Sequence, residues 1–252
     1  MSGLTRQAEA AWPVGLPSEG VSIAENIQVV RSRIERAAQQ SKRDPAGIAL
    51  MAVSKTQSVE RIVEAYEAGQ RLFGENRVQE FALKAALLSG LSDARFHLIG
   101  HLQGNKAAKA AALFNAIDSI DSLRLAERLN AAAEQENKRL PVLIEVNVGG
   151  EAAKAGVAPD SAELDALLQN APRLAALEIR GVMTVPPFTE EPEGARTYFR
   201  RLRKLRDAIA ARKLDGVSMG ELSMGMSHDF EIAIEEGSTC VRIGTAIFGK
   251  RE

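Results

Sequence analysis

The sequence is poor in several features that would point to particular classes of protein. It has a single cysteine, Cys240, so an internal disulfide is excluded and a reducing, cytoplasmic location is expected. No apolar run approaches the roughly 20 residues of a membrane-spanning helix. The first 20 residues lack the basic start and apolar centre of a secretion signal. Lysine and arginine number 32 against 33 acidic residues, so the charge balance predicts neither a nucleic-acid nor a membrane partner.

Metal-binding and dinucleotide-binding patterns are also missing. His97 and His101 are four residues apart, which suits zinc on a helix, but they flank the end of a predicted strand and no third ligand is evident. The first strand is followed by Val53-Ser54-Lys55-Thr56 and not by a glycine-rich fingerprint. We therefore expect no metal and no open dinucleotide-binding sheet.

What the sequence does have is a regular alternation of strand-like and helix-like segments. A capping-box pattern, Ser22-Ile23-Ala24-Glu25, opens the first helix. Eight segments have the pattern of buried strands, at 48–53, 71–74, 95–99, 116–119, 142–148, 178–185, 221–225 and 239–243. Eight strands with helical segments between them, in a chain of about this length, predict a single-domain α/β protein with the (β/α)8 TIM-type barrel fold. A doubly wound open sheet is the alternative. Residues 1–20 are expected to form a flexible tail and residues 21–252 the barrel.

Lys55 is the strongest candidate for chemistry. It follows the first predicted strand directly, and the carboxyl ends of barrel strands are where active sites lie. A partly desolvated lysine amine has a lowered pKa and attacks carbonyl carbon. A surface lysine in a loop is the plainer interpretation of this position alone.

The last predicted strand supplies a complementary candidate. Arg242 lies on it, and Gly244-Thr245 then begins what looks like a short helical turn, a combination that suits a phosphate. In a closed barrel the first and eighth strands are neighbours, so Lys55 and this turn are expected at one rim. A lysine beside a phosphate site predicts pyridoxal 5'-phosphate, held on Lys55 as an internal aldimine. Arg242 would face the pyridine nitrogen and keep it unprotonated, a strand-end ion pair being the alternative.

Several longer motifs carry a resemblance to a known family. They are Ala52-Val53-Ser54-Lys55-Thr56, residues 73–80, His97–Lys106, Ser119–Ser122, Val146–Val148, Arg180–Met183, Leu222–Ser227 and Val241–Gly249. In this order and over most of the chain, the motifs resemble the pyridoxal phosphate homeostasis proteins, which are single-domain relatives of the alanine racemase N-terminal barrel and share fold-type III.

The resemblance implies a role for each matching position. Asn76 would lie near the cofactor ring, and Ser223, Gly244 and Thr245 would bind the phosphate. Met224 and Ser227 would line the wall, and Arg242 would face the ring nitrogen. Because Ser218-Met219-Gly220 is repeated as Ser223-Met224-Gly225, the start of the seventh strand, and with it the role of Ser223, is open.

The resemblance implies a protein of intracellular vitamin B6 homeostasis without established catalytic activity, which we expect to be a monomer. Transfer of the cofactor to apo-enzymes is a further role to consider. A low-activity amino acid racemase is the alternative, but a racemase needs a second acid/base group, and both tyrosines, Tyr66 and Tyr198, lie in helical patterns. An empty barrel that serves only in protein interactions is the third hypothesis.

Overall fold

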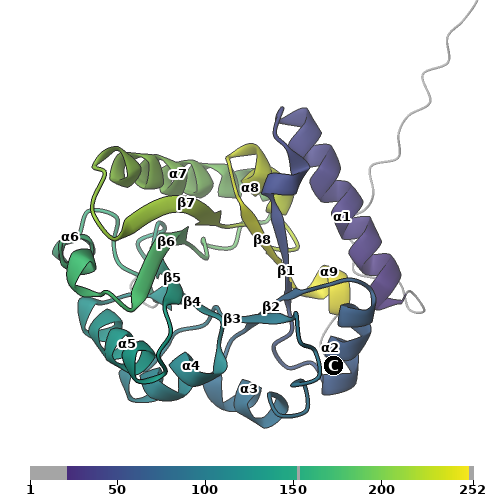
Figure 1. The fold of residues 1–252 in the computed structure, drawn as a ribbon. Helices are drawn as coiled ribbons and strands as arrows, with labels where there is room; N and C mark the ends of the chain where they lie inside the picture. Colours follow the sequence, from purple (N-terminus) through teal and green to yellow (C-terminus); the bar gives the residue numbers. More distant parts are fainter. Residues whose placement is uncertain (1–21, 152–153, 250–252) are drawn as a thin grey trace, which may run out of the picture.

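The computed structural model describes residues 22–151 and 154–249, and these form a closed barrel of eight parallel strands in sequence order (Figure 1). The strands are β1 Ala49–Val53, β2 Leu72–Glu75, β3 Arg95–Leu98, β4 Ala116–Ile120, β5 Leu140–Glu145, β6 Leu177–Met183, β7 Val217–Ser223 and β8 Cys240–Ile243. The predicted TIM-type barrel is confirmed, and the open sheet is excluded because β8 pairs with β1. The proposed tail, residues 1–20, lies outside the described residues, and its boundary with the barrel stays a prediction.

Helices surround the barrel in Figure 1 and connect each strand to the next. The α-helices are α1 Ile23–Gln40, α2 Val59–Glu67, α3 Val78–Lys84, α4 Ala107–Leu113, α5 Leu123–Gln135, α6 Ala162–Asn170, α7 Arg196–Ala211, α8 Phe230–Glu235 and α9 Thr245–Phe248. Short 3₁₀ helices lie at Pro45–Gly47, Gly104–Lys106, Ala171–Arg173 and Pro192–Ala195. In the part of the chain that the structure covers, no helix is both long and apolar enough to cross a bilayer.

The first helix closes the structure around the junction of β1 and β8. The expected capping box is present, with Ser22 and Glu25 each accepting a hydrogen bond from the other's backbone N–H. One face of α1 is buried, and α1 contacts both α8 and α9. Asn26 donates a hydrogen bond to the carbonyl of Ile247 in α9, a residue 221 positions away. This contact ties the two ends of the described chain together.

Alternation along strands such as β5 separates an outer apolar layer from a more polar interior. In β5, Leu140, Val142 and Ile144 belong to the hydrophobic core between strands and helices. Leu143 and Glu145 therefore point the other way, into the barrel. The interior is the place where charged side chains of the strands meet.

Every strand differs by at least one residue from its predicted bounds, and β5 and β7 differ most. Strand β5 ends at Glu145 and not at Val148, because Val146 forms only an isolated bridge, with Val157, before the chain turns. Strand β7 begins at Val217, so the first Ser-Met-Gly copy lies inside the strand and the second begins with its last residue. The predicted strand 221–225 was wrong at both ends, and Ser223 takes the position at the carboxyl end.

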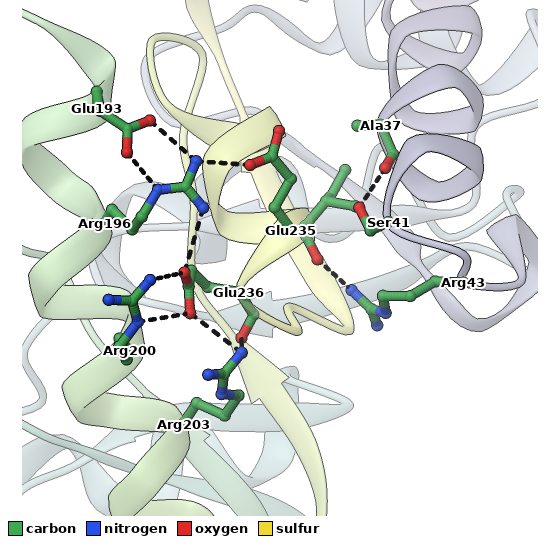
Figure 2. Close-up of polar contacts among 10 residues, drawn as sticks. Ala37, Ser41, Arg43, Glu193, Arg196, Arg200, Arg203, Glu235 and Glu236 are labelled. Carbon is green, nitrogen blue, oxygen red and sulfur yellow. Dashed lines mark hydrogen bonds and ion pairs between the residues drawn. The ribbon is translucent and has the colours of Figure 1, made fainter.

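An ion cluster fastens α8 to α7 just before β8 (Figure 2). The carboxylate of Glu236 lies 3.2 Å from Arg196, 2.8 Å from Arg200 and 3.0 Å from Arg203, and its side chain is only 5% exposed. Burial alone would raise the pKa of Glu236, but hydrogen bonds from Arg200 and Arg196 and the charge of Arg203 hold it below its usual value. The cluster therefore stabilises the segment that leads into β8.

Candidate functional site

The strand register places the main candidates at one rim. Ala52 of β1 pairs with Ile243 of β8 on one side and with Phe73 of β2 on the other. Lys55 follows Ala52 by three positions, Asn76 follows Phe73 by three, and Thr245 follows Ile243 by two. Because all strands are parallel, these residues lie at the carboxyl rim on three neighbouring strands.

A buried polar network fixes the turn that carries Lys55. Lys55 is half-buried, and the next residue, Thr56, has a positive φ of 65°. Ser54 donates a hydrogen bond of 2.8 Å to Glu75, and the Thr56 N–H donates one of 2.6 Å to Glu80. Both residues flanking Lys55 are thus held by carboxylates.

Lys84 completes this network from α3. Its Nζ atom lies 3.2 Å from Glu75 Oε1 and 3.0 Å from Glu80 Oε1, and it donates to the carbonyls of Ser54 and Gln57 at 3.4 and 3.2 Å. Burial raises the pKa of Glu75, an effect that the charge of Lys84 partly offsets. A buried lysine that joins two carboxylates and two carbonyls makes the turn rigid. Sequence reasoning did not identify this network.

The start of α9 lies directly against β1. A Cβ atom on Gly244 would be 3.5 Å from Cβ of Val53, which is two residues before Lys55. The first turn of a helix presents backbone N–H groups without intrahelical acceptors. The N–H of Ala246 donates to Ser227 Oγ at 3.3 Å, and Thr245 is exposed. Gly244, Thr245 and Ser227 are therefore brought together beside the Lys55 turn.

The loop that follows β7 is held tightly against β8. The N–H of Met224 donates to the Cys240 carbonyl at 3.1 Å, and that of Arg242 donates to the Gly225 carbonyl at 3.0 Å. Met224 is fully buried within the hydrophobic core, and Gly225 has a φ of 94°. Asp229 accepts a hydrogen bond of 2.7 Å from the Met226 N–H. These contacts fix the position of Ser227.

Arg242 is a buried cation inside the barrel, only 3% exposed. Its guanidinium donates to Ser223 Oγ at 2.7 Å and to the Thr184 carbonyl, at the end of β6, at 2.6 Å. Among the described residues no carboxylate lies within ion-pair distance of it, so the strand-end ion pair is not what the structure shows. Burial lowers the pKa of Arg242 from its usual value. Ser223 and Arg242 are therefore direct partners.

Glu145 is a rim residue that sequence reasoning missed. It ends β5 and is 8% exposed, and its Oε2 atom is buried without a hydrogen-bond partner among the described residues. Its pKa is raised to about 7, mainly by burial, while the charge of Arg242 lowers it, that of Asp121 raises it and that of His101 lowers it. A glutamate among the apolar residues of a predicted strand was the available signal.

The two histidines singled out in the sequence do not act together. His97 lies 3.2 Å from Asp118 and His101 lies 3.0 Å from Asp121. Asn76 packs against the residues that follow β3, because a Cβ atom on Gly100 would lie 2.3 Å from the backbone carbonyl oxygen of Asn76. Within the described ranges, no group of three or more potential ligands could hold a metal ion.

Comparisons with known proteins match the whole barrel. The family described as the alanine racemase N-terminal domain matches residues 22–252. The pyridoxal phosphate homeostasis protein of Aquifex aeolicus is 43% identical over 232 residues, which are 92% of this chain and all of that protein. The protein of that name from Pseudomonas aeruginosa is 44% identical, over 92% of this chain and 96% of its own.

A solved structure is similar over the same region. The structure of PipY from Synechococcus elongatus with PLP bound is 38% identical, has a TM-score of 0.79, and is matched over 90% of this chain and 100% of its own. Each of these three alignments covers nearly all of this chain and nearly all of the relative. The chain therefore belongs to the pyridoxal phosphate homeostasis protein family, whose members have the barrel of the alanine racemase N-terminal domain.

Proposed function

We propose that this protein binds pyridoxal 5'-phosphate at the carboxyl rim and acts in vitamin B6 homeostasis. The observation that carries the proposal is the pairing of β1 with β8, which sets Lys55 beside the Gly244-Thr245 turn. A structural relative, PipY, has PLP bound, and the curated relatives are named for pyridoxal phosphate homeostasis.

The polar groups of the rim fit such a cofactor. The cofactor has an aldehyde, a phosphate and a ring nitrogen, and the rim offers a lysine amine, a helix start and a buried guanidinium for these three groups. Arg242 has no carboxylate within ion-pair distance among the described residues, and Glu145 has a buried oxygen without a partner there. Groups of this kind are costly in an empty protein interior and are stabilised by a polar ligand.

Each residue has a defined part in the proposal. The bound cofactor supplies an electrophilic aldehyde, and the Lys55 amine is the group that bonds to it. Gly244, Thr245, Ser223 and Ser227 bind the phosphate. The Ser223 oxygen already accepts a hydrogen bond from Arg242, so its hydroxyl hydrogen is the part that serves the ligand.

The remaining three predicted residues bound the ring. Arg242 donates toward the ring nitrogen and so disfavours a proton there. Asn76, after β2, and Met224, after β7, border the ring from either side of the β1–β8 pair.

The proposed role is that of a carrier without an established reaction. The protein would hold the cofactor on Lys55 and pass it to apo-enzymes, as a cytoplasmic monomer. Neither tyrosine supplies the tyrosine base of a racemase in this chain. Tyr66 is bonded to Asp93 and stacks on Arg71 before β2, at the opposite end of the barrel, and Tyr198 packs against the hydrophobic core from α7.

Glu145 favours a second candidate, a low-activity amino acid racemase. A racemase needs a second proton-transferring group besides the lysine. A carboxyl group whose pKa is about 7 could fill this role, because it can both donate and accept a proton at neutral pH. It also ends β5, which lies across the barrel from β1. Incubation with single enantiomers of alanine, serine and glutamate tests this candidate. Multiple turnovers that Glu145→Gln abolishes would support the racemase over the carrier.

The binding proposal is tested by spectroscopy and peptide mapping. The purified protein should absorb in the visible range, lose that absorbance with borohydride, and then carry the reduced cofactor on the peptide that contains Lys55. Lys55→Ala should remove the absorbance, and Lys109→Ala, at an exposed position on α4, should leave it unchanged. Mapping to Lys84, the neighbouring lysine of the network, would contradict the assignment of Lys55.

A further inference from the structure

A second cavity opens at the amino-terminal mouth of the barrel, away from the rim of Lys55. Its volume is about 710 Å³, within the range of small-molecule sites. It is lined by residues at or before the strand starts, such as Gly47, Leu72 and Asn115, by residues further along the strands, and by none of the eight predicted cofactor-binding residues. The cavity is therefore separate from the proposed cofactor site.

The floor of this cavity is acidic. Asp118 of β4 is 2% exposed, and its carboxylate lies 3.2 Å from His97 Nδ1. Glu221 of β7 also lines the cavity, and burial together with the nearby charge of Asp118 raises its pKa. Two carboxyl groups thus face one space, and a positively charged ligand between them would offset the repulsion that contributes to the raised pKa of Glu221.

The mouth of the same cavity is basic. Arg95 and Arg180 both line it. Arg180 is already bonded to Glu178 and lies 3.9 Å from Glu221, whereas Arg95 is exposed and has no ion-pair partner among the described residues. The apolar residues Met51 and Leu143 also line the cavity.

An acidic floor, an apolar wall and a basic mouth match the charge distribution of a zwitterion. We propose that this cavity binds a free α-amino acid, with its ammonium group between Asp118 and Glu221 and its carboxylate at Arg95. A metal ion fits less well, because within the described ranges no three potential ligands converge. An ammonium group needs only hydrogen-bond acceptors, which the two carboxylates provide.

Calorimetry with three probes tests the proposal. L-valine has both charges, isobutylamine lacks the carboxylate, and isovalerate lacks the ammonium group. L-valine should bind in a one-to-one ratio and at least about 10-fold more tightly than either analogue, since a hydrogen bond to a charged group contributes about 1.5–3 kcal/mol. Equal affinity for all three probes, or no binding of L-valine, would overturn it.

Variants separate this site from the rim. Arg95→Gln, at an exposed position, should weaken the binding of L-valine about 10-fold and leave the affinity for isobutylamine unchanged. Arg139→Gln, near the same end of the barrel but not lining this cavity, is the matched control. Asp118→Asn should weaken both amines, with thermal unfolding as the check on folding. Unchanged L-valine binding in Arg95→Gln and Asp118→Asn would refute the assignment.

Lys55→Ala distinguishes the two sites. L-valine binding should persist in this variant, because Lys55 is at the other rim. If the protein proves colourless but still binds L-valine, the proposed cofactor function fails and the cavity proposal stands. Binding that disappears with Lys55→Ala would place the amino acid at the cofactor rim and refute the second site.

Discussion

Replacing Lys84 with methionine is the most direct test of how the Lys55 turn is held. The methionine keeps most of the side-chain volume but removes the charge that joins Glu75 and Glu80 and two hydrogen bonds to carbonyls. Removing one partner of a buried ion pair typically costs 3–5 kcal/mol. Because Glu75 can take up a proton and Glu80 is partly exposed, we expect about 3 kcal/mol. For a chain of this size that corresponds to a fall in Tm of about 6–12 °C.

The cost of Lys84→Met should depend on pH in a defined direction. Burial already raises the pKa of Glu75 above 4.5, and loss of the lysine raises it further. A carboxyl group whose pKa is higher in the folded than in the unfolded state makes the protein less stable as the pH rises from the unfolded-state pKa to the folded-state pKa. The variant should therefore be destabilised more at pH 8 than at pH 5, as measured by urea unfolding at both pH values.

A double variant separates charge from packing. Glu75→Gln combined with Lys84→Met leaves no buried charge at this position and should cost less than Lys84→Met alone at pH 8. Cofactor affinity should fall about 10-fold in the single variant, since the loosened turn no longer positions Lys55. A cost below about 0.5 kcal/mol that is the same at both pH values would refute the reasoning.

Three further variants, two of them with a matched control, test other parts of the structure. Glu145→Gln should make the free energy of unfolding less dependent on pH. In the wild type the pKa of Glu145 is about 7 when folded against 4.5 when unfolded, which costs up to about 3 kcal/mol as the pH rises through that interval. Parallel plots of unfolding free energy against pH for wild type and variant would contradict this. Glu236→Gln should destabilise the protein by about 2–3 kcal/mol at pH 7, because its pKa is lowered and its contribution is present above pH 4.5 and lost at lower pH. Glu193→Gln, with a side chain 64% exposed in the same cluster, should leave the unfolding midpoint close to that of the wild type. Gly225→Ala should cost about 2–4 kcal/mol, because its φ is 94° and the new Cβ would lie 2.6 Å from Ala233, whereas Gly220→Ala in the repeated tripeptide meets nothing closer than 3.8 Å; equal unfolding midpoints for the two would be inconsistent with the register of β7.

The order of strands and the rim were predictable because both follow from periodicity. The apolar run before Lys55 has the length of a buried strand, and closure of eight parallel strands then places Lys55 beside Gly244. The ends of β5 and β7 were not predictable, since Val146 is as apolar as a strand residue and the repeated Ser-Met-Gly fits either register. Only the pairing of β7 with its neighbours decides between the copies.

The supporting groups of the site were hidden for a different reason. Lys84 lies on a helix where an exposed position is the usual expectation, and its carbonyl partners come from a turn about 30 residues earlier. Glu145 is one charged residue in an apolar strand, and its unpartnered oxygen is a property of the packed barrel. Such three-dimensional contacts leave no periodic signal along the chain.

The pairing of β1 with β8 has a consequence for the synthesis of this protein. Lys55 is synthesised 190 positions before Thr245, in the turn that we propose binds the phosphate. A nascent chain on the ribosome would therefore contain the Lys55 amine well before the Gly244-Thr245 turn that we propose makes it selective for the cofactor. Cofactor capture should begin only after α9 has left the ribosome, when α1 can also pack against it through the hydrogen bond from Asn26 to Ile247.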